Sequence, residues 1–308
     1  MNLILHDIRH GIPLPDDLVQ CVVTSPPYWQ LRDYQTGPDQ LGMEPTPDAF
    51  IDTLVAIFRD VRRVLRHDGT LWLNIGDSYA SGPMTAAETT GQRSGTTLNG
   101  RRGHVDNVAL AQRRSPVPHG LKPKDLIGVP WMLAFALRAD GWYLRSEIIW
   151  HKPNPMPESV KDRPTKSHEH VFLLTKSAKY LYDADAIAEP VEKGAAGSTF
   201  INGKTGVNGN GRVSALPRQE RATRNARSVW AVPTQGFPEA HFATFPEALV
   251  EPCVLAGSRP GDVVLDPFVG SGTTGVVAQR YGRQFIGIDN SPVYLDMAAR
   301  RIDESRYA

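Results

Sequence analysis

The sequence predicts an α/β fold with a mostly parallel sheet and helices on both of its faces. Short apolar runs alternate with amphipathic segments along the 308 residues, as in chains that pack helices against a sheet. Some of these runs, such as residues 20–24, have no polar alternation, which is typical of parallel strands buried on both faces. A glycine-rich turn separates a strand pattern from a helix pattern near residue 270.

The first half of the chain is predicted to form a strand that begins at residues 3–5 and ends at Asp7, a strand over 20–24, a helix over about 46–66 and a strand over 70–75. Apolar residues recur every three or four positions in the helix segment. Pro47 suits the first helical turn, and Gly69 is expected at the exit from the helix.

The second half is predicted to form a helix over about 125–139, strands over 143–150 and 170–174, a helix after Pro246, a strand over 263–265, a helix, a strand over 285–288 and a last helix. Residues 78–124 and 186–228 are rich in glycine and polar residues without periodicity, and they are expected to be inserted loops. The length allows one large domain with insertions or two ordinary domains.

The net charge of +1 hides an uneven distribution. Residues 93–124 and 193–227 together hold 14 basic and 2 acidic residues, and the remainder holds 20 basic and 31 acidic residues. Basic loops on an acidic body suggest contacts with phosphates, although they are also compatible with a merely solvated surface. The two cysteines form no CxxC pattern, and no apolar run has the length of a membrane span, so a cytoplasmic protein is expected.

The glycine-rich turn predicts a site for an adenosine-containing ligand. Gly270, Gly272 and Gly275 follow the strand that ends at Asp266, and Asp289 ends the next strand, at the distance expected for a ribose-binding carboxylate. The absence of a lysine after the turn excludes a Walker phosphate loop. The alternative is a tight turn that packs helix on strand and binds nothing.

The position of the glycine-rich turn in the chain bears on whether the ligand is NAD. Only 19 residues follow Asp289, so the remaining strands of the sheet must come from earlier in the chain. The sheet is therefore predicted to be circularly permuted relative to a dinucleotide dehydrogenase, which disfavours NAD as the ligand.

A second turn, in the segment VVTSPPYW, follows the predicted strand at 20–24. Methylation of a nucleobase amine requires acceptors that hold its N–H bonds, because the amine lone pair is delocalised into the ring. The Ser25 hydroxyl and the Pro26 carbonyl provide such acceptors, Pro27 fixes their angle, and Tyr28 offers a face on which a flipped base stacks. Tyr28 and Trp29 are alternatively core aromatics.

TSPPYW early and LDPFVGSGTTG late resemble, in this order, the catalytic and cofactor motifs of the β-class DNA amino-methyltransferases. The segments 148–176 and 241–268 are also similar to family segments. The resemblance implies a circularly permuted Rossmann-like class I methyltransferase with a seven-stranded sheet. It further implies a catalytic half over 1–185 with a basic insert at 78–124, a target-recognition insert over 186–235, and a cofactor-binding half over 236–308.

The resemblance implies S-adenosyl-L-methionine as the cofactor and double-stranded DNA as the substrate. The residues expected to hold the cofactor are Asp7, Phe245, Pro246, Asp266, Pro267, Phe268, Gly270, Gly272 and Asp289. The residues expected to contact DNA are Arg101, Arg102, Arg221, Arg224 and Arg227. The sequence leaves open whether a cognate restriction endonuclease exists and whether the chain is a monomer or a weak homodimer.

Serine at the first position of the Ser-Pro-Pro-Tyr tetrad resembles the cytosine-N4 members of the family, and adenine-N6 remains the alternative base. Two other classes remain open: an RNA or protein-glutamine methyltransferase, and a non-catalytic dinucleotide-binding regulator. No metal site is expected, although His168, His170, Glu169 and His151 invite one. Arg163 and Glu169 are alternatively a structural ion pair.

Overall fold

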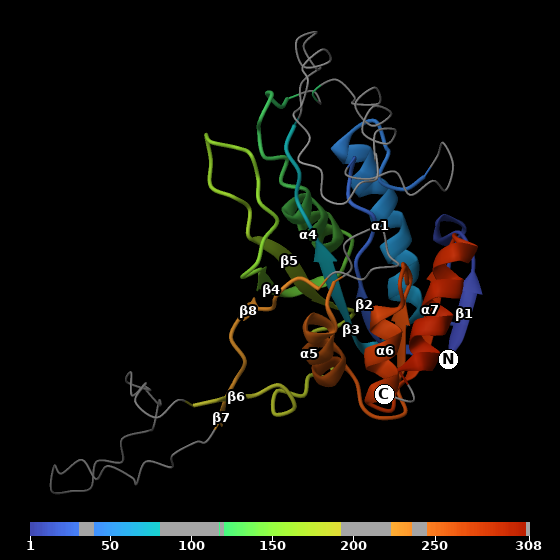
Figure 1. The fold of residues 1–308 in the computed structure, drawn as a ribbon. Coiled ribbons are helices and arrows are strands. Elements are labelled where there is room, and N and C mark those ends of the chain that lie inside the picture. The colour runs from blue at the N-terminus through green and yellow to red at the C-terminus, as the bar shows by residue number, and fades with distance from the viewer. Residues whose placement is uncertain (31–39, 81–116, 118–119, 192–222, 236–244, 306–308) are drawn as a thin grey trace, which may run out of the picture.

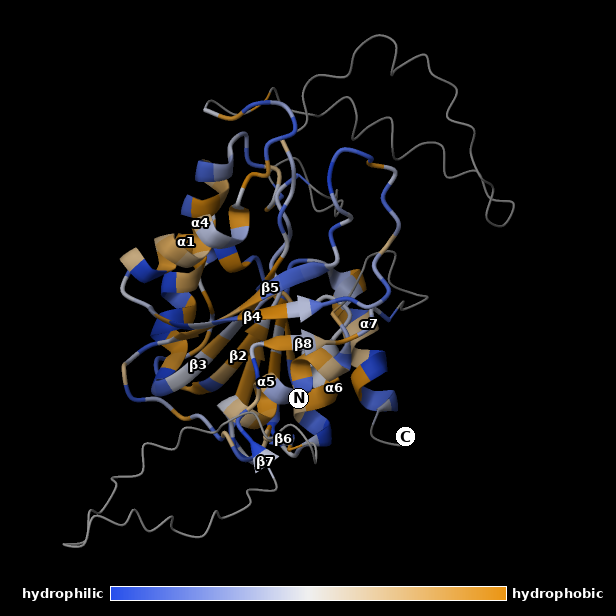
Figure 2. Cartoon of the chain, turned by 90° about the vertical axis from the view of Figure 1, so that its left-hand side faces the viewer, coloured by the Kyte–Doolittle hydropathy of each residue, from blue (hydrophilic) through white to orange (hydrophobic). Residues whose placement is uncertain are grey.

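The computed structural model describes residues 1–30, 40–80, 117, 120–191, 223–235 and 245–305. A central sheet has helices on both faces, with α1 and α4 on one face and α5, α6 and α7 on the other (Figure 1). In Figure 2 the strands in the middle of the molecule are mostly apolar, and the helices around them mix apolar and polar residues. No helix of the described part of the chain is both long enough and apolar enough to cross a membrane.

The main sheet has eight strands in the order β1-β10-β9-β2-β3-β5-β4-β8. Their bounds in chain order are β1 Asn2–Leu5, β2 Val19–Thr24, β3 Leu65–Ile75, β4 Tyr143–His151, β5 His168–Thr175, β8 Val229–Ala231, β9 Val263–Asp266 and β10 Gln284–Asp289. β5 is antiparallel to both of its neighbours, and the other pairs are parallel. A separate two-stranded sheet pairs β6 Glu189–Pro190 with β7 Thr223–Arg224.

The helices are α1 Pro47–Val64, α4 Val129–Ala139, α5 Glu247–Gly257, α6 Thr273–Arg280 and α7 Pro292–Glu304, with a short 3-10 helix, η1, at Ile8–His10. Thr46 caps α1 by accepting a hydrogen bond from the backbone N–H of Ala49 at 3.1 Å, and Pro47 occupies the first helical position. Phe50, Leu54 and Val61 are fully buried, as the apolar spacing predicts.

The strand order confirms the predicted permutation. β9 pairs on one side with β10, its neighbour in sequence, and on the other with β2, from the start of the chain. The carboxyl ends of β2 and β9 therefore lie side by side, although Thr24 and Asp266 are 242 residues apart. The sheet has one strand more than the predicted seven because β8 pairs with β4 at the edge.

Some predicted element ends are wrong: β1 ends at Leu5 and not at Asp7, and α4 begins at Val129 and not near residue 125. α1 ends at Val64 and β3 begins at Leu65, so Gly69 lies inside the strand and not at the helix exit. Leu65 fits both patterns, but it pairs with Val19 of β2, and sheet pairing decides its conformation. The segment 186–235, predicted as the target-recognition insert, includes residues of the main sheet. Trp230 of β8 stacks on the ring of Trp72 at 6.3 Å between centroids.

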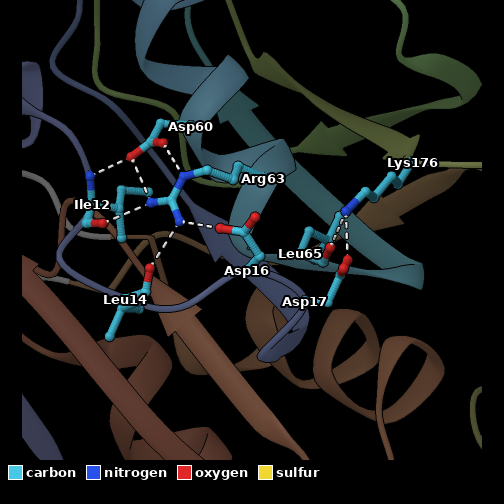
Figure 3. A network of polar contacts seen from close by, with 8 residues as sticks. All are labelled: Ile12, Leu14, Asp16, Asp17, Asp60, Arg63, Leu65 and Lys176. Atoms are coloured by element: carbon cyan, nitrogen blue, oxygen red, sulfur yellow. Dashed lines mark hydrogen bonds and ion pairs between the residues drawn. The ribbon is translucent and has the colours of Figure 1, made fainter.

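A polar network fixes the start of β2 against α1 and β5 (Figure 3). The Arg63 guanidinium donates hydrogen bonds to Asp60, to Asp16 and to the backbone carbonyls of Ile12 and Leu14. Lys176, after β5, donates to Asp17 at 2.6 Å and to the carbonyl of Leu65 at 2.7 Å. These contacts hold β2 at its amino end, and the Ser-Pro-Pro-Tyr tetrad follows its carboxyl end.

Candidate active site

Both predicted motifs line one cavity of about 710 Å³ at the carboxyl ends of the parallel strands. The tetrad Ser25–Tyr28 follows β2, and the turn from Pro267 to Ser271 follows β9. The loop between β4 and β5 and the amino end of β5 also line it. Open α/β sheets place ligands at this edge, and the volume lies in the range of small-molecule sites.

A hydrogen-bond network holds the Tyr28 ring in the cavity wall. Its hydroxyl donates to Glu169 Oε2 at 2.6 Å and accepts from Asn74 Nδ2 at 3.0 Å. Asn74 Nδ2 also lies 3.3 Å from Ser25 Oγ, which is 3.4 Å from the tyrosine hydroxyl. β2, β3 and β5 each contribute to this network, so the tyrosine has one defined orientation.

Glu169 is neutralised from its other side by Lys152, which donates to Oε1. The Lys152 ammonium also lies over the Trp150 ring, 4.3 Å from its centroid. The sequence prediction of an Arg163–Glu169 ion pair is wrong, because Arg163 pairs with Glu158 at 2.7 Å. Glu169 instead faces the cavity.

Space for the Tyr28 ring depends on Gly76, the first residue after β3. A Cβ atom at this position would lie 2.6 Å from Tyr28 Cε2. Trp29, the next residue after Tyr28, is 4% exposed and donates its indole N–H to the Glu44 carbonyl at 2.9 Å. The core-aromatic alternative therefore holds for Trp29 and not for Tyr28, which lines the cavity.

The glycine-rich turn is organised around Asp289 at the end of β10. Its carboxylate accepts hydrogen bonds from the backbone N–H groups of Gly270 and Ser291, both at 3.0 Å. Burial raises the pKa of this carboxyl above its ordinary value. Gly270 and Gly272 have φ of +46° and +82°, a left-handed region that glycine adopts without strain. The turn places Phe268, Gly270 and Asp289 in the cavity wall.

Asp266, predicted to bind the cofactor, lies outside the cavity lining. It is 1% exposed and accepts hydrogen bonds from Thr24 Oγ1 at 2.7 Å, from Thr274 Oγ1 at 2.8 Å and from the Phe268 N–H at 3.1 Å. Burial raises its pKa to about 6. The carboxylate thus joins β9 to β2 and to α6.

The other residues predicted to hold the cofactor also divide into those that line the cavity and those that do not. Asp7, Phe245 and Pro267 line the cavity, whereas Gly272 and Pro246 do not. A Cβ atom on Gly272 would lie 2.9 Å from the Ala298 Cβ, so this glycine permits α6 and α7 to approach each other. Pro246 is the N-cap of α5. Asp7 pairs with Arg9 at 2.6 Å, and this hydrogen-bonded ion pair lowers the pKa of Asp7.

Sequence analysis missed several polar residues that line the cavity, among them Asn74, Asp77, Lys152 and Lys166. A signal existed for two of them, because Asn74 interrupts the apolar strand TLWLNI near its carboxyl end and Asp77 follows that strand. Asp77 accepts hydrogen bonds from the N–H groups of Gly128 and Val129 at the start of α4. Lys152 and Lys166 carried no signal in the proline-rich segment.

A family model described as "DNA methylase", for N6 and N4 methylases, matches residues 19–300. The chain belongs to this family. It is an S-adenosylmethionine-dependent DNA methyltransferase, as the tetrad and the glycine-rich turn predict. The match includes both motifs and every strand of the main sheet except β1.

Several known proteins are similar over most of the chain. The type II methyltransferase M.Cfr9I of Citrobacter freundii is 50% identical over 94% of this chain and 83% of its own. M.SmaI of Serratia marcescens is 48% identical over 98% and 90%. The structure of PvuII DNA methyltransferase, cytosine-N4-specific, has a TM-score of 0.62 at 16% identity over 99% of this chain and 90% of its own, which shows the shared fold.

A Thermus thermophilus protein described as a DNA modification methylase, in complex with S-adenosyl-L-methionine, has a TM-score of 0.59 at 24% identity over 99% of this chain and 93% of its own. In the methylase described here, the cavity fits this cofactor on its own geometry. Asp289 would offer acceptor oxygens to ribose hydroxyls, Phe268 and Phe245 would offer apolar surface to an adenine ring, and the glycine turn would admit close approach.

The arginines predicted to contact DNA are only partly described. Arg101, Arg102 and Arg221 lie outside the described residues. Arg224 and Arg227 both pair with Glu189, at 3.2 and 2.7 Å, beside the β6–β7 sheet. In Figure 1 this small sheet lies apart from the carboxyl ends of the main-sheet strands. A DNA-binding role for these two arginines stays a prediction.

The histidines of the methylase that suggested a metal site have other partners. His170 Nδ1 lies 2.7 Å from Glu147 Oε1, and its ring stacks on Phe172. Burial lowers the pKa of His168. Within the described ranges, no three or more His, Cys, Asp or Glu side chains are grouped as metal ligands.

Proposed function

We propose that this methylase modifies the exocyclic N4 amine of a cytosine that is flipped out of duplex DNA. The observation that carries the proposal is that Ser25 and Pro26 line the same cavity as Gly270. A target amine in this cavity meets acceptors on one side and the cofactor turn on the other. Its similarity to the type II methyltransferases M.Cfr9I and M.SmaI supports a site-specific modification enzyme.

The tetrad is suited to hold an amine that is a poor nucleophile. Its two N–H bonds can donate to Ser25 Oγ and to the Pro26 carbonyl, which localises the lone pair on nitrogen. Bound S-adenosylmethionine supplies a sulfonium methyl group: the new N–C bond forms as the C–S bond breaks, S-adenosylhomocysteine leaves as a neutral thioether, and the methylated amine loses one proton to solvent. The protein then contributes orientation, because attack must be in line with the breaking carbon–sulfur bond.

The polar network behind the tetrad supports this orientation. Tyr28 can stack on a flipped base only if its ring stays in place, and Glu169 and Asn74 hold its hydroxyl from two sides. Lys152 compensates the charge of Glu169 in a site where both side chains are under 20% exposed. The ring is thus positioned before a base arrives, which limits the ordering cost on binding.

The choice of cytosine over adenine rests on Ser25. A hydroxyl both accepts and donates, so Ser25 can accept from the amine and donate to the adjacent ring nitrogen of cytosine. Adenine-N6 is the alternative target, since adenine also presents an amine next to a ring nitrogen.

Nucleoside mass spectrometry tests the proposal. Unmodified DNA incubated with the methylase and S-adenosylmethionine is expected to yield N4-methylcytosine, and modification-sensitive sequencing then locates it in one short sequence. N6-methyladenine in place of N4-methylcytosine would transfer the proposal to the alternative base. The absence of any methylated nucleoside, with cofactor binding intact, would contradict it.

The predicted DNA contacts of Arg224 and Arg227 can be tested through salt dependence. If both contact phosphates, replacing both by glutamine should flatten the slope of log Kobs against log salt by roughly 1 to 2. Glu189→Gln is the matched control, because it removes their carboxylate partner without removing either cation. Glu189→Gln should strengthen DNA binding at low salt. An unchanged slope in the double variant would locate the phosphate contacts elsewhere.

A further inference from the structure

Met156 is the most exposed large apolar side chain that the structure describes. It is 86% exposed, ahead of Val293 at 68%. A single exposed apolar residue is ordinary on a protein surface, so exposure by itself indicates nothing. The place of Met156 is what matters: it lines the mouth of the active-site cavity together with Pro155 and Pro157, its neighbours in the chain.

The loop that carries Met156 is anchored on both sides. It joins β4 to β5, and its ends are tied by a hydrogen bond from the Lys152 N–H to the Ser167 carbonyl at 2.8 Å. Asn154 exchanges hydrogen bonds with the backbone of Thr234, at 2.8 and 3.2 Å. After Met156, Glu158 pairs with Arg163 at 2.7 Å.

The prolines stiffen this loop further. Asn154 and Met156 each precede a proline, which disfavours helical conformations and favours extended backbone at both positions. In Figure 1 the loop projects beyond the strands that it connects. Met156 is therefore held outward on a braced loop, and its exposure does not come from a frayed end.

The chemistry of the site indicates what such a side chain meets. A base that enters the cavity leaves a gap in the duplex, and the bases beside the gap lose a stacking partner. Apolar side chains, methionine among them, serve in other proteins as wedges between base steps. Methionine suits a gap of irregular shape because its side chain is unbranched and flexible.

We propose that Met156 is a wedge that enters the base stack at the position vacated by the flipped target base. This inference rests on the proposed function, since it requires a duplex whose target base reaches Tyr28. Met156 then stabilises the flipped state from outside the cavity and takes no part in methyl transfer. Its contribution should be large for a paired target and small for a target that is already unpaired.

The test compares two duplexes that carry the site found by sequencing, one fully paired and one with an abasic nucleotide opposite the target. Met156→Ala should lower kcat/KM at least about ten-fold on the paired duplex and less than about two-fold on the other. Met156→Leu should retain most of the activity. With 2-aminopurine at the target position and thymine opposite it, so that the probe is paired, the fluorescence increase on binding should be smaller for Met156→Ala than for the wild type.

Val160→Ala is the control, because Val160 lies on the same loop, is 39% exposed and does not line the cavity. It should match the wild type on both duplexes. An equal loss on both duplexes for Met156→Ala, or no loss on either, would overturn the wedge. Failure of the wild type to methylate either duplex would instead overturn the proposed function, so the two failures are distinguishable.

Discussion

Replacing Ser25 by alanine is expected to lower kcat for DNA methylation by about 10²-fold or more, with little change in S-adenosylmethionine affinity. The magnitude follows from the usual cost of removing one polar group that acts in the transition state. Ser25 lines the cavity within 3.4 Å of the Tyr28 hydroxyl, and alanine removes the acceptor without adding volume. Single-turnover rates and calorimetric cofactor affinities separate the two parameters.

Two further variants show whether the Ser25 hydroxyl or the backbone of the tetrad holds the target amine. Ser25→Thr keeps the hydroxyl and should retain more activity than Ser25→Ala. Tyr28→Phe keeps the stacking face and removes the hydroxyl that joins Glu169 and Asn74, so a smaller loss is expected than for Ser25→Ala. If Ser25→Ala kept the wild-type kcat, the contact with the target amine would be assigned to the Pro26 carbonyl alone.

Asp289→Ala should weaken S-adenosylmethionine binding by about 10²-fold, because it removes an ionised acceptor for ribose hydroxyls. It also leaves the N–H groups of Gly270 and Ser291 without their carboxylate. Burial raises the pKa of Asp289, so the carboxyl gains its proton at a higher pH than an exposed aspartate does. Affinity should therefore fall as pH decreases through that raised pKa, and this fall should be absent from Asp289→Ala.

Asp266→Ala is the matched comparison, on the strand beside β10. Asp266 is 1% exposed and its partners are Thr24, Thr274 and a backbone N–H, so alanine leaves buried donors unsatisfied. A larger fall in the Tm of the ligand-free protein is expected for Asp266→Ala than for Asp289→Ala, because the hydrogen bonds of Asp266 are buried and those of Asp289 are only partly buried. The reverse pattern would exchange the structural and binding roles assigned to these aspartates.

Local patterns determined the motifs and most elements of this protein. The proline-stiffened tetrad and the glycine-rich turn each lie within a few consecutive residues, so the order of the chain displays them directly. The order of the motifs also indicated the permutation, because the tetrad precedes the glycine-rich turn in the chain. Element ends were less certain, as Leu65 shows: it fits the helix period, but its pairing with Val19 places it in β3.

Tertiary structure alone decided which polar groups support the tetrad and which carboxylate faces the cavity. Glu169 reaches Tyr28 across 141 residues, and Asp266 reaches Thr24 across 242, so no local pattern could pair them. Both aspartates that end β9 and β10 were expected to hold the cofactor, yet Asp289 lines the cavity and Asp266 is buried among Thr24, Thr274 and a backbone N–H. The physical reason is that these interactions depend on strand neighbours in the sheet, which are distant in the chain.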